Sequence, residues 1–190
     1  MHSGWGVLVA VSDAAEVLDR WRIVIVGDKA PGGKMPFHHA ETFAVAKAEE
    51  YLADYTTECQ SLAQKEIAKA IDDLKARGYK LIAAGLVLAS GKPLPELAKI
   101  LASHPLIHTA EGELFRNVAR RAVESFGVSV FGYRERDLVD RAEAAFAEIA
   151  SKMIQELADA GKTIGPPWTA DHKCAALAAC LAMRERAGSP

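Results

Sequence analysis

The pattern of apolar and polar positions divides the first part of the chain into a strand pair and a long helix. A short apolar run at residues 6–11 precedes a turn, and residues 16–26 then alternate apolar and polar side chains, which predicts an antiparallel hairpin. Between residues 39 and 77 apolar side chains recur at helical spacing, and Gly78 is a typical helix stop. Such a helix would be about 55 Å long at 1.5 Å per residue. We therefore expect either a break at residues 55–57 or, as we favour, a long helix that forms a homodimer.

The remaining chain alternates strands and helices. The continuous apolar run at residues 80–89 predicts a strand covered on both faces, and a brief strand follows at residues 128–133. Pro93 and Pro95 are predicted to open a short helix that ends at residue 101. Three further helices are predicted over residues 109–126, about 138–160 and 169–186. This order indicates a single α/β domain over residues 1–190, with a mixed sheet that begins antiparallel and continues with parallel strands.

Composition narrows the class of protein. The chain has 190 residues, half of them hydrophobic and a quarter charged, which is ordinary for a globular domain with its own core. Its net charge of −2 gives no broad basic surface, which weakens a nucleic-acid partner but leaves it as an alternative. Three scattered cysteines indicate neither a disulfide framework nor a zinc cluster. No apolar run reaches the roughly 18 residues of a membrane span, and no cleavable signal is evident, so we expect a cytoplasmic protein.

Glu111 is the most informative candidate residue. It lies three and four positions before Leu114 and Phe115, so it shares the apolar stripe of the predicted 109–126 helix. An acid on a buried face usually has a partner or a chemical task. Two structural explanations compete with a functional one: an acid in a first turn complements the helix dipole, and Lys173 could pair with Glu111.

The order of elements resembles the ribonuclease H-like fold, in which a strand hairpin precedes alternating helices and strands. The alanine-rich last helix, with Leu177, Ala178 and Ala179, is similar to that of RuvC-type Holliday-junction resolvases. Three segments are also similar to a group of bacterial proteins that has no established activity, so that likeness implies a shared fold and no reaction. These segments are residues 108–116, residues 134–138, and residues 165–168 together with 173–179.

The chain departs from the nuclease pattern at the expected acids. Ribonuclease H-like nucleases carry an aspartate in the first strand, whereas the first acid here is Asp13, and a start codon chosen too late would account for its loss. Ser90 stands where the middle strand would end in an acid. On the last helix His172 and Ala175 take the acidic positions, with Asp171 one position out of register. We therefore favour a ribonuclease H-like binding or assembly module that lacks a full catalytic set.

Two enzymatic or ligand-binding alternatives remain open. In the first, a nuclease or resolvase-like enzyme holds Mg²⁺ or Mn²⁺ between Glu111 and Asp171, with His108 and Lys173 assisting, since phosphodiester cleavage of this kind needs convergent carboxylates. In the second, Arg134 and Arg136 bind a small anionic ligand at the carboxyl edge of the sheet.

Ordinary surface chemistry competes with each of these sites. The arginines between residues 116 and 141 lie among acids, which favours a salt-bridged surface. His108, a lone histidine beside the core, is more often a hydrogen-bonded structural residue than a metal ligand. His104 is weaker still, and His38, His39 and Glu41, which could chelate an ion, are better explained as a solvated loop. No P-loop, GxGxxG, GxSxG or HExxH motif occurs. Whether the protein is an enzyme stays open.

Overall fold

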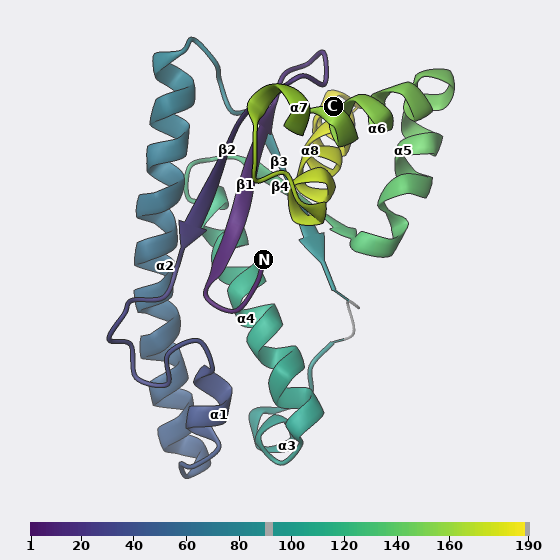
Figure 1. Ribbon diagram of the computed structural model, residues 1–190. Coiled ribbons are helices and arrows are strands. Elements are labelled where there is room, and N and C mark those ends of the chain that lie inside the picture. The colour runs from purple at the N-terminus through teal and green to yellow at the C-terminus, as the bar shows by residue number, and fades with distance from the viewer. Residues whose placement is uncertain (90–92, 189–190) are drawn as a thin grey trace.

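The N-terminal hairpin forms as predicted. In the computed structural model, which describes residues 1–89 and 93–188, strand β1 (Trp5–Val11) pairs antiparallel with β2 (Val17–Val24). A register shift between Ala10 and Val11 ends the regular ladder. Figure 1 shows this hairpin between the long helix on one side and the C-terminal helices on the other.

The long helix is continuous. Helix α2 (Val45–Ala76) has 32 residues and follows the short α1 (Pro36–Ala40), so the long helix that we favoured is confirmed and the alternative, a break at residues 55–57, is wrong. Thr56 and Thr57 fit within it because their hydroxyls donate hydrogen bonds to the carbonyls one turn earlier, on Leu52 and Ala53. The helix packs along β2 and along α4 (His104–Glu124) of the same chain. Its apolar face is thus covered within one molecule, and the homodimer stays a prediction.

The second strand pair is parallel. Strand β3 (Ala83–Leu88) pairs with β4 (Ser129–Arg134), and α3 (Leu97–Leu101) and α4 form the crossover between them. In the described chain the four strands make two separate two-stranded sheets, β1–β2 and β3–β4. The α/β class and the change from antiparallel to parallel pairing are therefore confirmed. The described residues form no continuous four-stranded sheet, because β1 and β3 are not hydrogen-bonded to each other.

Several helices complete the C-terminal part. One helix was predicted up to residue 160, but the structure has two, α5 (Leu138–Phe146) and α6 (Ala150–Asp159), because Ala147 adopts a positive φ of 47° that a helix cannot continue through. The short α7 (Gly161–Ile164) and the last helix α8 (Ala170–Gly188) follow. Helix α8 packs across both β1 and β3 and approaches β3 closely at Gly85, which lies against the Ala178 carbonyl. Small residues at this crossing allow strand and helix backbones to meet.

The apolar interior has three parts. One lies between α8, α5, α6 and β3, a second between α2, α4 and the end of β2, and a third joins α1, α3 and the N-terminal halves of α2 and α4. The third part supports the site described next. Across the described residues, no helix combines the length and the apolar character needed to cross a membrane.

Candidate metal centre

Helix α4 begins earlier than the sequence predicted, and this changes the surroundings of Glu111. The helix starts at His104, with Pro105 in its first turn, where a missing backbone N–H costs nothing. Glu111 is therefore the eighth residue of the helix, which rules out the first-turn dipole explanation. His104, His108 and Glu111 follow one another at helical spacings of four and three, so they lie on one face.

Helix α1 brings a third histidine to this face. Pro36 begins the helix, while Phe37 and Ala40 pack into the core shared with α2 and α4, and this packing fixes the direction of His38. The preceding loop is held by Tyr51, whose hydroxyl donates a hydrogen bond to the Pro31 carbonyl. Burial, with smaller contributions from Cys59 and Glu111, raises the pKa of Tyr51 to about 12, so its phenol remains a neutral donor. The loop that leads into α1, and so to His38, is thus anchored.

The three imidazole rings converge. One ring nitrogen from each of His38, His104 and His108 lies within 4.8 Å of the others. The Nε2 atoms of His104 and His108 are 3.1 Å apart. In a tetrahedral zinc site with Zn–N bonds of about 2.0–2.1 Å, two ligand nitrogens are separated by about 3.3 Å. The spacing therefore matches that of two histidines on one ion, to within a small side-chain movement.

Glu111 orients His38. The Glu111 side chain is only 5% exposed, and its Oε1 lies 2.9 Å from His38 Nδ1 and 3.4 Å from the His38 backbone nitrogen. Its other oxygen, Oε2, lies 4.0 Å from His108 Nδ1. A carboxylate is an acceptor, so His38 Nδ1 donates this hydrogen bond, and in the neutral tautomer that binds metals the lone pair is on Nε2. That Nε2 is buried and has no hydrogen-bond partner among the described residues.

A buried lone pair without a donor is costly unless it is coordinated. A carboxylate behind a metal-binding histidine is a recurring arrangement, because it fixes the tautomer and the ring orientation and makes the free nitrogen more basic. The His38–Glu111 pair has this arrangement, with the unsatisfied Nε2 being the ring nitrogen that Glu111 does not hold. The donor set of three imidazoles suits Zn²⁺ and other divalent transition metals rather than Mg²⁺.

The centre is open to solvent on one side. The His108 side chain is 56% exposed and His104 is also exposed, whereas His38 is 19% exposed. Three protein ligands leave one position of a tetrahedral ion unfilled, which is typical of catalytic rather than structural zinc sites. A water or a donor atom of a substrate could take this position.

The second predicted acid has different surroundings. Asp171 lies near the start of α8, half exposed, and its Oδ2 is 2.9 Å from His2 Nε2. Among the described side chains, no group of three convergent metal-binding residues includes Glu111 or Asp171. Lys173 is exposed, and Glu111 takes its partners from His38 and His108 rather than from Lys173. His172 forms a local cap in which its Nδ1 accepts from the Thr169 backbone N–H.

The predicted arginine site resembles a salt-bridged surface. The Arg134 Nε lies 2.6 Å from Asp137 Oδ2, and Arg136, whose side chain is 75% exposed, lies 3.4 Å from the same carboxylate. Arg134 and Arg136 therefore share one acid at the end of β4. Ser90, the position of the missing middle-strand acid, lies outside the described residues.

Sequence reasoning underestimated two ligands of the candidate centre, His38 and His104. A local signal for His104 was present, because histidines four residues apart on a helix face, followed by an acid three residues later, form a metal-binding pattern. It was missed because the helix was predicted to start at Thr109. No local signal identifies His38, since its approach to α4 depends on tertiary packing.

Comparison with protein-family models, with curated proteins and with solved structures found no match for this chain.

Proposed function

We propose that this protein binds a divalent transition-metal ion, Zn²⁺ first, through His38, His104 and His108. The observation that carries the proposal is the buried, unpartnered His38 Nε2, whose ring is held by Glu111 and whose neighbours are two further imidazoles. The open fourth position favours metal-assisted hydrolysis, in which zinc lowers the pKa of a bound water to about 7.

A calorimetric titration with Zn²⁺ tests the proposal. We expect one binding site in the wild-type protein and a loss of affinity of more than about 100-fold in His104→Ala or His108→Ala, since removing a ligand outweighs the loss of an outer partner. Both residues are exposed, so the fold should tolerate these changes. His39→Ala is the matched control, because His39 is adjacent in sequence but its ring lies against Phe43 and Tyr51. Equal zinc affinity in His39→Ala and His108→Ala would contradict the proposal.

A ribonuclease H-like nuclease remains a second proposal, supported by the antiparallel hairpin followed by parallel strands. It needs Glu111 and Asp171 to hold one Mg²⁺ or Mn²⁺ ion between them, although Asp171 now pairs with His2 and Glu111 with His38. Incubation with branched and single-stranded DNA in Mg²⁺ or Mn²⁺ tests it, because cleavage that Glu111→Gln leaves unaffected would remove Glu111 from the mechanism. Without any cleavage, a binding or assembly module is favoured.

A further inference from the structure

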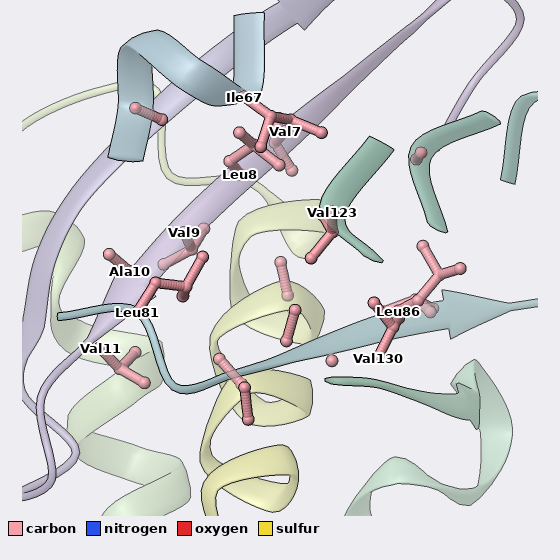
Figure 2. A pocket seen from close by; sticks show the side chains of 18 of the residues that line it. Val7, Leu8, Val9, Ala10, Val11, Ile67, Leu81, Leu86, Val123 and Val130 are labelled. Atoms are coloured by element: carbon pink, nitrogen blue, oxygen red, sulfur yellow. The ribbon is translucent and has the colours of Figure 1, made fainter. Parts of the chain in front are cut away.

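An apolar cavity of about 690 Å³ separates β1 from β3. Figure 2 shows Val7, Val9 and Val11 on the β1 side, and Leu81 and Leu86 on the side of β3. Helix α8 lines one face of the cavity, and α2 and α4 line the opposite face. The cavity is therefore a slot within the layered structure, between the edges of the two small sheets and between two layers of helices.

The strand edges along this slot have open backbone positions. In the described chain β1 pairs only with β2, and β3 pairs only with β4. The Trp5 carbonyl faces away from β2, since it accepts a hydrogen bond of 2.8 Å from the His2 N–H. Alternate residues of an antiparallel strand direct their backbone groups to the same edge, so Val7 and Val9 present theirs to the slot as well. Backbone groups lining an apolar space require hydrogen-bond partners.

The directions of the strands fit one particular occupant. Figure 1 shows β2 and β3 running in the same direction, and β1 runs opposite to β2. A strand in the slot could thus pair antiparallel with β1 and parallel with β3 at the same time. Met1 and His2 already take this direction, because His2 forms an antiparallel bridge with Trp5 on the open edge of β1, and both residues line the slot.

Arg116 provides a separate indication. It lines the slot, its side chain is only 11% exposed, and its Nε is buried without an acceptor among the described residues. The Arg116 side chain borders the slot, so a peptide there would bring backbone carbonyls near a side chain whose Nε still lacks an acceptor in the described chain. A lipid tail or another apolar ligand would leave the backbone groups of the open strand edges without partners.

We infer that the slot holds one further β-strand, supplied by polypeptide joined to Met1, which unites the two small sheets in the order β2–β1–new strand–β3–β4. The position of Met1 and His2 favours a strand in the same polypeptide over a separate peptide, because these residues already guide it into place. Helices cover both faces of the slot, so the new strand carries apolar side chains in both directions. The inference is independent of the metal centre.

The test uses the full chain with a six-residue extension of valine, isoleucine and threonine fused before Met1. The control extension has the same length with proline at alternate positions, which removes the N–H donors. Amide hydrogen exchange is measured at Val7, Val9 and residues 83–88, with Leu8 as an internal reference because its backbone faces β2. We expect the extension, but not its proline control, to slow exchange at Val7 and Val9 by roughly tenfold or more.

Each other outcome overturns the inference. Val7 and Val9 amides as protected as Leu8 in the unextended chain would show that the edge is not open. Unchanged exchange on extension would show that the slot does not accept a strand. Equal protection by the same six residues added as a separate peptide, or protection that appears only in a dimer on size-exclusion chromatography, would show that the source of the strand is wrong.

Discussion

Replacing Glu111 with glutamine separates metal affinity from folding. The Glu111 side chain is 5% exposed, and its Oε1 accepts a hydrogen bond of 2.9 Å from His38 Nδ1. Glutamine retains the size and one oxygen acceptor, so His38 can keep its orientation, but the negative charge behind the ring is lost. Loss of such a carboxylate typically lowers metal affinity by about 10- to 100-fold. We expect a value near the lower end for Glu111→Gln, and near the upper end for Glu111→Ala, which also removes the acceptor.

The expected loss of zinc affinity also appears as a smaller gain in the free energy of unfolding when zinc is added. With free zinc at about 100 times the wild-type dissociation constant, binding raises the free energy of unfolding by about 2.7 kcal/mol. A tenfold weaker affinity reduces this gain to about 1.4 kcal/mol at the same zinc concentration. Without metal, Glu111→Gln should change stability little, because it removes a buried charge while keeping a hydrogen bond, whereas Glu111→Ala leaves the His38 donor unpaired and costs about 1–3 kcal/mol.

The assay is urea unfolding with chelator and with buffered zinc, combined with a chelator-competition titration. Glu113→Gln is the matched control, because Glu113 lies on the same helix and pairs with Arg116 at 3.0 Å, outside the histidine cluster. Wild-type zinc affinity in Glu111→Gln and in Glu111→Ala would refute the assignment of Glu111 as the residue that prepares His38 for the metal.

Three further predictions concern the scaffold. Gly85→Ala should lower the free energy of unfolding by about 1–3 kcal/mol, since the added Cβ overlaps the Ala178 carbonyl, and urea unfolding showing no loss would contradict the close packing of β3 on α8. Phe115→Ala should lower the free energy of unfolding by about 3–5 kcal/mol in the same assay, because Phe115 is only 1% exposed. A loss as small as that of a typical surface substitution would contradict its position in the core. Burial, with the nearby Arg20 charge, lowers the pKa of His172, so its contribution to stability is complete above an unfolded-state pKa of about 6.5 and is lost as the pH falls below it. Unfolding curves at about pH 7.5 and pH 5 should therefore differ less in His172→Gln than in the wild type, and equal differences would contradict this.

Helices and strands with a strong periodicity of apolar residues were predictable from the sequence. The hairpin, the long helix and the order of later strands and helices follow from the alternation of apolar residues, which local geometry determines. The helix boundary at His104 was not found, because the apolar stripe becomes continuous only after Thr109, while Pro105 permits an earlier start. Ala147 interrupts the predicted 138–160 helix through a positive φ that alanine rarely adopts, and no residue pattern in the sequence predicts this break.

The candidate site was predictable only in part. The buried position of Glu111 was predicted and is confirmed, since it depends on helix periodicity alone. Its partner was not predictable, because His38 lies 73 residues away and reaches Glu111 through the packing of α1 on α4. The separation of the strands into two pairs was likewise hidden, because an apolar run predicts a strand but not its neighbour.

X-ray absorption spectroscopy of the zinc-loaded protein tests the metal centre most directly. The account predicts three imidazole nitrogens at about 2.0–2.1 Å from the ion and one further light atom from solvent. In His108→Ala one imidazole should be lost from this shell. A shell of oxygen atoms alone, or the same imidazole count in the wild type and in His108→Ala, would contradict the three-histidine centre.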